Sequence, residues 1–230
     1  MTLQKNNTFS MDYLSEVFNS ARKMGYTFVT MSEYLKIDNT SGKYFITRLD
    51  LDFKPATLQP FVTLSQTLSI PFTIFVRVGG PYNFLWYPNF KVIDDAERSG
   101  CEIGLHGAPV EWADLLNRNT EETFASELAV LRSKFRVSGF APHRDINYVY
   151  NSLPWLEQQW SKLERCYNLT YHAYQEVFLR DIIYVNEGFS PHLGWRNMTP
   201  IEAMETKKNI YMLLHPHWWH VDHPYEADWA

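Results

Sequence analysis

The chain has 230 residues, 45% of them hydrophobic and 20% charged, which suffices for one well-buried domain but does not require two. A net charge of −5 and a pI of about 5.9, with no basic run, argue against a protein that binds the phosphate backbone of a nucleic acid. Two cysteines, Cys101 and Cys166, are too few for a disulfide framework and are not spaced as a zinc site.

Helix and strand signals alternate along the chain. In chain order we expect a helix over 10–25, a strand over 45–53, a helical stretch over 56–70 that Pro60 interrupts early, a strand over 71–78, a short helix over 90–100, a strand over 101–107, a helix over 119–135, a strand and turn over 137–144, a helix from 199, and a strand over 210–215. This alternation in one compact length predicts a single α/β domain with a parallel sheet.

Capping signals mark the start of three of these helices. Ser10 is an N-cap candidate, and Asn119 has a Glu three positions later, as in a capping box. Thr199 is followed by Pro200 at the first helical position and by Glu202 as its capping-box partner. We therefore expect helices to begin directly after these residues.

The strand over 45–53 ends with two carboxylates on one face. Period-two alternation puts Asp50 and Asp52 on the same side as Ile46 and Arg48. In an antiparallel sheet with one wet face these carboxylates would be solvated. At the end of a buried parallel strand they would lie where catalytic groups collect.

Three histidines end other predicted strands. His106 closes "CEIGLH", His143 closes "GFAPH", and His215 closes "IYMLLH". In a parallel sheet or barrel the C-terminal ends of the strands share one rim. Together with the aspartates, four segments therefore deliver titratable groups to the same place.

At these residues the sequence resembles the polysaccharide deacetylase family, the carbohydrate esterases built on a NodB-homology domain. The likeness runs in order from about residue 45 to 220, through "RLDLD", "FTIFVRVGG", "CEIGLHG", "APHRD" and "LLHPHWW". The resemblance implies a distorted (β/α) barrel of the NodB-homology type, with residues 1–230 as a single catalytic domain.

The resemblance also implies roles for the residues at the rim. Asp50 would be the general base, Asp52 and His106 metal ligands, and His215 the catalytic acid. The family's second metal histidine is replaced by Val110, so we expect His143 to complete the ligand set. Leu51 separates two aspartates that are adjacent in the family, and the choice between Asp50 and Asp52 as base or ligand stays open.

One carboxylate and two imidazoles with an open position form a ligand set that suits one divalent metal ion. Zn²⁺ is the first choice, with Co²⁺, Ni²⁺ and Fe²⁺ as alternatives. Such an ion would activate a water and polarise an amide carbonyl. Asp50 would take the proton of the water, and His215 would protonate the departing nitrogen.

Substrate contacts are expected from Arg144, Trp195 and Trp218. Arg144 follows His143, and its positive charge would also keep the carboxylate base ionised. The chain has 8 Trp, 14 Tyr and 15 Phe, which fill a core or line a groove for sugar rings. We place Asn186 and Glu187 along the same groove.

A histidine-rich stretch, "HPHWWHVDHP", follows the last strand. His217, His220 and His223 look like a metal cluster, but alternation directs their side chains differently. We therefore interpret them as surface or substrate contacts.

The resemblance implies a hydrolase that removes an N-acetyl group from a sugar during bacterial surface polysaccharide synthesis. Its partner would be an acetylated sugar or glycan precursor, without nucleic acid; the oligomeric state stays open. No stretch has the length of a membrane span, and residues 1–14 contain no apolar run of signal-peptide length, so we expect a cytoplasmic protein. The alternatives are a C–N hydrolase for a small non-sugar amide and an inactive carbohydrate-binding protein of the same fold.

Overall fold

The computed structural model describes residues 9–37, 42–143, 151–187 and 194–219. Its strands are β1 Tyr26–Val29, β2 Lys43–Leu51, β3 Thr73–Arg77, β4 Glu102–Gly107, β5 Val137–Pro142, β6 Tyr171–His172, β7 Ile182–Asn186 and β8 Asn209–Leu214. Its α-helices are α1 Met11–Lys23, α2 Met31–Tyr34, α3 Gln59–Leu68, α4 Tyr87–Arg98, α5 Pro109–Leu115, α6 Thr120–Arg132, α7 Ser152–Tyr167 and α8 Pro200–Glu205. Short 3₁₀ helices are η1 Pro55–Leu58, η2 Glu176–Phe178 and η4 Pro216–Trp218.

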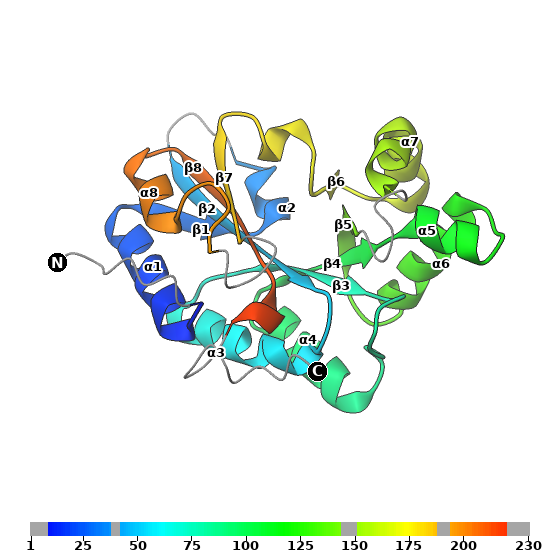
Figure 1. Cartoon of the computed structure of the whole chain (residues 1–230), viewed down its shortest axis with the longest axis horizontal. Helices are drawn as coiled ribbons and strands as arrows, with labels where there is room; N and C mark the ends of the chain where they lie inside the picture. The colour runs from blue at the N-terminus through cyan, green and yellow to red at the C-terminus, as the bar shows by residue number, and fades with distance from the viewer. Residues whose placement is uncertain (1–8, 38–41, 144–150, 188–193, 220–230) are drawn as a thin grey trace.

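All the described strands belong to one parallel sheet, which confirms the predicted α/β class. The strand order is β6-β5-β4-β3-β2-β8-β7, with every pair parallel. β1 pairs with the start of β2, and β3 with its end, while β8 pairs with the middle of β2. β2 is therefore the strand on which the whole sheet is assembled (Figure 1).

Both faces of β2 are buried, because the sheet has a layer of helices outside and curls around a second core inside. Phe45, Leu49 and Leu51 pack into the outer core with the apolar faces of α1, α3, α4 and α6. Ile46 and Arg48, on the other face, point into the inner side of the sheet. The alternation in the sequence identified the two faces correctly, and neither of them faces water.

The inner core shows how strongly the sheet curls. Residues of the edge strands β6 and β7 belong to the same cluster as residues of the central strands β2 and β3. The rings of Tyr171 and Phe178 lie 5.5 Å apart, and those of Phe178 and Tyr211 lie 5.9 Å apart. Within the described residues β6 and β7 do not pair, so the curled sheet is a half-barrel. Such a sheet is compatible with the distorted barrel that the sequence predicts.

The predicted helix starts agree with the structure. The Ser10 side chain accepts a hydrogen bond from the Tyr13 amide, and Thr199 and Glu202 form a complete capping box. Asn119 accepts hydrogen bonds from two amides of the first turn of α6. Ser10, Thr199 and Asn119 are thus the N-caps of α1, α8 and α6.

Two helices differ from the prediction at their starts. Pro60 does not interrupt a helix: a 3₁₀ turn, η1, leads directly into α3, and Pro60 lies in the first turn of α3, where proline costs no hydrogen bond. The helix expected from residue 90 already begins at Tyr87, because Pro88 starts it in the same way.

No element was predicted between 145 and 198, where the structure has α7, β6, η2 and β7. The α7 helix begins at Asn151, whose side chain accepts a hydrogen bond from the Leu153 amide. Pro154 lies near its start, where proline is tolerated but where the sequence alone suggests an interruption. The strands β6 and β7 are short, so they carry little periodicity. None of the described helices is long and apolar enough to cross a bilayer.

Candidate metal centre

Neighbouring strand ends bring Asp52, His106 and His143 together. His106 is the strand partner of Arg77 on β3 and of Ala141 on β5, so the ends of these strands are level. Asp52 directly follows β2, whose last residue, Leu51, pairs with β3 as well. The backbone amide of His143 donates to the Gly107 carbonyl at 2.8 Å and extends the β4–β5 pairing by one residue.

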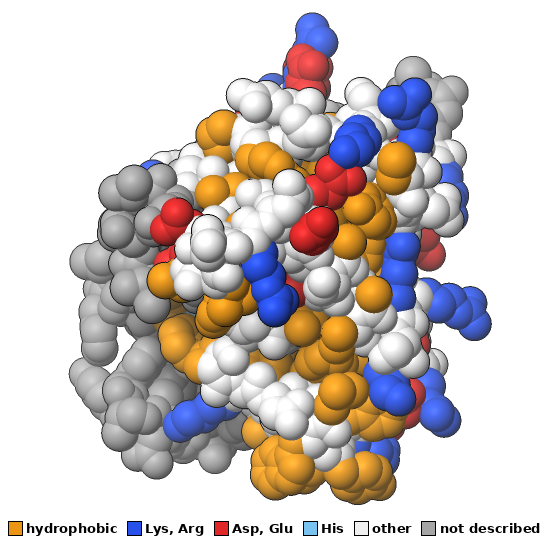
Figure 2. All heavy atoms as spheres, turned by 90° about the vertical axis from the view of Figure 1, so that its right-hand side faces the viewer, with side chains coloured by type: hydrophobic (Ala, Val, Ile, Leu, Met, Phe, Trp, Pro, Cys, Tyr) orange, Lys and Arg blue, Asp and Glu red, His pale blue; other side chains and the backbone are white. Residues whose placement is uncertain are grey.

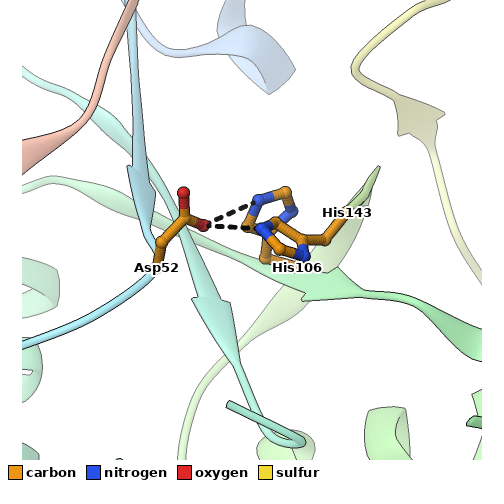
Figure 3. Close-up of side chains that lie close together, drawn as sticks. All are labelled: Asp52, His106 and His143. Atoms are coloured by element: carbon orange, nitrogen blue, oxygen red, sulfur yellow. Dashed lines mark ion pairs between the residues drawn. The ribbon is translucent and has the colours of Figure 1, made fainter. Parts of the chain in front are cut away.

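The three side chains point toward one another (Figure 3). The Oδ1 atom of Asp52 lies 3.2 Å from Nε2 of His106 and 3.4 Å from Nε2 of His143. The two imidazole rings are nearly perpendicular, with centroids 4.8 Å apart. One donor atom of each residue lies within 4.8 Å of the donor atoms of the other two, so the three residues could together hold a metal ion.

Hydrogen bonding of His106 directs its free nitrogen at the carboxylate. Its Nδ1 atom lies 2.8 Å from the carbonyl oxygen of Ala141, which can only accept, so Nδ1 carries the proton and donates it there. In the neutral ring Nε2 then presents a lone pair to Oδ1 of Asp52. Two electron-rich atoms facing each other at 3.2 Å need a cation or a proton between them.

The observed spacing fits a tetrahedral ion. Metal–ligand bonds of about 2.0–2.1 Å at tetrahedral angles separate the ligand atoms by about 3.3–3.4 Å. The nitrogen–oxygen separations of 3.2 and 3.4 Å at Asp52 agree with this geometry. The Oδ1 atom is also buried without a hydrogen-bond partner among the described residues, an arrangement that a metal ligand accounts for. The donor set fits one divalent metal ion.

Asp50 lies beside this site but is held by a different partner. Arg48 donates to both of its oxygens, at 2.7 and 2.6 Å, and the guanidinium is fully buried between the rings of Phe75 and Tyr174. Burial alone would raise the pKa of Asp50, but the charges of Arg48 and His106 outweigh it and lower the pKa. Asp50 is therefore ionised, and its Oδ2 atom lies 3.4 Å from Nε2 of His106.

The pKa of Asp52 is also lowered. Burial opposes this shift, and the imidazoles of His106, His215 and His143 outweigh it. Asp52 and Asp50 are thus both available as anions at one rim, although they are 7% and 3% exposed.

His215 faces the site from the end of β8. Its Nε2 atom lies 3.8 Å from Oδ2 of Asp52, and its Nδ1 atom lies 2.7 Å from Oε2 of Glu187. Burial would lower the pKa of His215, but the hydrogen bond and charge of Glu187, with the charges of Asp52 and Asp50, raise it to about 9. This raised pKa favours the protonated form of His215 at neutral pH.

Glu187 is the residue whose role the sequence did not reveal. It was placed along a groove, whereas the structure buries its side chain completely. Oε2 accepts from the backbone amide and ring of His215, and Oε1 accepts from the indole of Trp219. The available signal was its position directly after an apolar strand, in "IIYVNE", which is the same signal that located the histidines.

The predicted substrate contacts lie in different places. The Trp218 ring is 4.6 Å from His215 and partly buried, so it borders the site. Trp195 packs against Phe9 and Trp219, at 5.4 and 6.2 Å, and contributes to the core. Arg144, His192, His220 and His223 lie outside the described residues.

His217 and Val110 complete the comparison with the expected ligand set. The His217 ring lies 4.8 Å from Phe53 and 6.0 Å from His215, and burial lowers its pKa to about 4. It is not part of the three-residue cluster. Val110 is in the first turn of α5, and His143, the residue that follows β5, supplies a donor atom instead.

Comparison with known proteins adds no family. No family model and no curated protein matches the chain. Among solved structures, it is weakly similar to Escherichia coli diaminopropionate ammonia lyase in its apo form, with a TM-score of 0.25 and 12% identity over 91% of this chain. The match covers 50% of that protein, so the chain spans about half its length. A similarity this low supports no conclusion about fold or activity.

Proposed function

We propose that the protein is a metal-dependent hydrolase that removes an N-acetyl group from a sugar, on a distorted barrel of the NodB-homology type. The observation that carries the proposal is the convergence of Asp52, His106 and His143 between an ionised carboxylate, Asp50, and a protonated imidazole, His215. Amide hydrolysis needs these parts, namely an electrophilic centre, a base for the water and an acid for the leaving nitrogen.

A divalent metal ion held by Asp52, His106 and His143 would act as a Lewis acid on the amide carbonyl and activate a water near neutral pH. Asp50 would take the proton of the attacking water. Each carboxylate oxygen accepts two hydrogen bonds, so the bidentate contact with Arg48 leaves acceptor capacity while it fixes the orientation of Asp50. The lowered pKa keeps this acceptor ionised.

His215 would give its proton to the departing nitrogen. Its raised pKa keeps the ring charged before the reaction, and Glu187 stabilises that charge from the far side of the ring. Nδ1 is engaged by Glu187, so Nε2 is the nitrogen that faces the metal ligands and donates.

Aromatic side chains beside His215 support a sugar as the substrate. Trp218 packs on the His215 ring, and Phe53, which is 49% exposed, packs on His217. An apolar wall with a few directed polar groups is the usual lining of a site for a small organic ligand. A small non-sugar amide would use the same acid, base and metal but would not need this wall.

The test is metal content together with acetate release. Protein purified without chelator should contain about one divalent ion per chain. Asp52→Ala, His106→Ala and His143→Ala should each lose most of it, whereas His217→Ala, a nearby histidine outside the cluster, should retain it. Metal-loaded protein should release acetate from N-acetylglucosamine or its oligomers, and chelator should abolish the release reversibly.

Other results would change the proposal. Full occupancy in Asp52→Ala and His106→Ala would place the metal elsewhere. Metal-dependent cleavage of small aryl amides, without acetate release from any sugar, would favour the non-sugar amidase. A protein that binds sugar, but binds no metal and hydrolyses no substrate, would be a carbohydrate-binding protein.

A further inference from the structure

Three consecutive apolar side chains are exposed where α4 begins. Leu85, Trp86 and Tyr87 are 46%, 61% and 70% exposed, and we call them the α4 tip. Figure 1 places the start of α4 at the lower end of the molecule, and Figure 2 shows hydrophobic side chains gathered at the lower end of the face that it draws. Single exposed apolar residues are common on protein surfaces, whereas a group of large ones marks an interaction site.

Hydrogen bonds and a buried anchor hold the α4 tip in this exposed position. The Oδ1 atom of Asn83 accepts a hydrogen bond from the Leu85 amide at 2.9 Å. The Asn83 carbonyl accepts from the Trp86 amide at 3.2 Å and from Nδ2 of Asn89 at 2.9 Å. Phe84, directly before the tip, is buried in the outer core. The tip is therefore a fixed turn that presents its apolar side chains to the outside.

The connection that carries the α4 tip is joined to the end of β2. The hydroxyl group of Tyr82 donates a hydrogen bond to the Leu51 carbonyl at 2.8 Å and accepts one from the Arg77 amide at 3.0 Å. Leu51 directly precedes Asp52, the candidate metal ligand. The α4 tip thus belongs to a connection that starts at the same edge of the sheet as the metal centre.

The segment that carries the α4 tip has basic residues but no acidic ones. Residues 53–93 contain Lys54, Arg77 and Lys91 and no Asp or Glu, although the whole chain has 26 acidic residues and a net charge of −5. Lys91 is exposed near the start of α4, and its ion pair with Asp95 is a surface pair of the kind that contributes little. Lys54 is exposed directly before η1, which packs against α4. The charge of this segment therefore complements an anionic partner.

Exposed Trp and Tyr rings next to lysines are the side chains that favour the headgroup region of a lipid bilayer. The rings combine an apolar body with one polar atom and concentrate at the boundary between lipid and water, while lysines attract anionic headgroups. We propose that the α4 tip docks the protein on the surface of an anionic lipid bilayer, with Lys54 and Lys91 against the lipid phosphates. This interaction goes beyond the proposed hydrolysis and does not depend on it. It would bring the edge of the sheet that carries the metal centre toward the membrane.

Cosedimentation of the full chain with lipid vesicles tests the docking directly. The wild type should bind vesicles of equal parts phosphatidylcholine and phosphatidylglycerol about tenfold or more tightly than vesicles of phosphatidylcholine alone. Leu85→Ser combined with Trp86→Ser should weaken binding to the anionic vesicles by about tenfold or more, because it removes apolar area that enters the headgroup region. Both side chains are exposed, and serine is a preferred residue at the N-cap position that Trp86 occupies, so the melting temperature should not fall.

Each arm of the experiment has a matched control. Leu115→Ser combined with Leu116→Ser removes another adjacent apolar pair, 60% and 51% exposed, at the end of α5, and should keep wild-type binding. Lys91→Gln should weaken binding to the anionic vesicles by about fivefold, as expected for one lysine near an anionic surface. Its control is Lys162→Gln, because both lysine side chains are about half exposed and each pairs with one carboxylate. Lys162→Gln should bind like the wild type.

Several outcomes would overturn the docking surface. They are a wild type that binds neither kind of vesicle, equal binding to both kinds, and binding that the Leu85→Ser, Trp86→Ser variant retains. Self-association of the wild type without lipid, lost in that variant, would assign the α4 tip to a second copy of the chain, and sedimentation velocity measures it. The variant should keep the wild-type metal content, so failure of the docking leaves the proposed hydrolase standing, and loss of metal binding by the wild type leaves the docking standing.

Discussion

Asp50 and Asp52 are the same residue type two positions apart, yet their surroundings give them different properties. Arg48 donates hydrogen bonds to both oxygens of Asp50. Its guanidinium does not deprotonate in proteins, so Asp50 always faces a positive charge. The ion pairs of Asp52 with described residues are with imidazoles, whose nitrogens are metal donors. The contacts thus support Asp52 as ligand and Asp50 as base, the assignment that the sequence order alone left open.

Arg48 and Asp50 form a buried ion pair, so replacing Asp50, the proposed base, should also reduce stability. Asp50→Asn should retain metal and lose most activity, and it should also destabilise the fold by roughly 3–5 kcal/mol, because Arg48 is left as an uncompensated buried charge. The double substitution Arg48→Met with Asp50→Asn should recover much of that loss. Urea unfolding with metal removed measures both effects.

Asp95→Asn is the control for this experiment. Asp95 pairs with Lys91 on the exposed side of α4, so its neutralisation should change stability little. If Asp50→Asn were as stable as the wild type, another group would balance the charge of Arg48, and the contact with Asp50 would not be the one that stabilises it.

His215 makes a prediction about leaving groups. His215→Ala should slow hydrolysis of an N-acetylated sugar amide by roughly 10²–10⁴-fold, the usual contribution of a general acid. An activated aryl acetate needs little protonation of its leaving group, so its hydrolysis should stay near the wild-type rate. The ratio of the two kcat/KM values is the measurement. Equal losses on both substrates would show that His215 is not the acid.

At the scale of elements, the strand ends account for what the sequence predicted. Asp52, His106, His143 and His215 all follow or end an apolar strand, and parallel strands bring such positions together whatever the details of packing. Caps and apolar spacing likewise predicted α1 and α6, whereas α2 and α5 were not predicted. The coarse fold and most of the site therefore depend on local patterns.

The residues that the sequence did not assign depend on the curl of the sheet. Arg48 was correctly placed on the face of Asp50, but alternation does not tell whether a face is wet, and the partner of the base was sought in Arg144. Only the curled sheet, which buries the inner face of β2 with Phe75 and Tyr174, makes Arg48 that partner. Glu187 reaches His215 because β7 lies next to β8, and β7 was not predicted.

Glycines in the strands are part of the curled arrangement and can be tested. An ideal Cβ at Gly139 on β5 would lie 2.3 Å from the ring of Tyr171, its partner on β6. Gly139→Ala should therefore displace a fully buried ring and destabilise the protein by roughly 1–3 kcal/mol, as overpacking does. Thermal unfolding of Gly139→Ala against Ser138→Ala, on the same strand, measures the cost. A wild-type melting temperature in Gly139→Ala would show that Tyr171 moves aside freely.

At the scale of the whole molecule, the curl of the sheet buries polar and charged side chains on its inner face. The Arg48–Asp50 pair, the Glu187–His215 pair and the buried tyrosines Tyr171 and Tyr211 all lie on or near its inner face. Burying such groups costs free energy unless partners satisfy them, so a shift in strand register that separates these pairs should be unfavourable. Stability should therefore depend on pH wherever a buried group titrates differently in the unfolded chain.

His172 at the edge strand β6 provides a test of this dependence away from the metal centre. It is 5% exposed and packs against Trp160, and burial lowers its pKa from 6.5 to about 4. As the pH falls, the unfolded chain takes up the proton first, so the contribution of His172 is complete above pH 6.5 and is lost progressively between pH 6.5 and 4. At 1.36 kcal/mol per pKa unit the loss is on the order of 3 kcal/mol.

His172→Phe keeps a ring against Trp160 and removes the titrating group, so the variant should lose less stability over this range than the wild type. The difference between their free energies of unfolding at pH 7 and pH 4.5, measured on chelated protein, isolates His172 from the carboxylates of the metal centre. Parallel curves for the two proteins would show that His172 binds its proton equally well in the folded state.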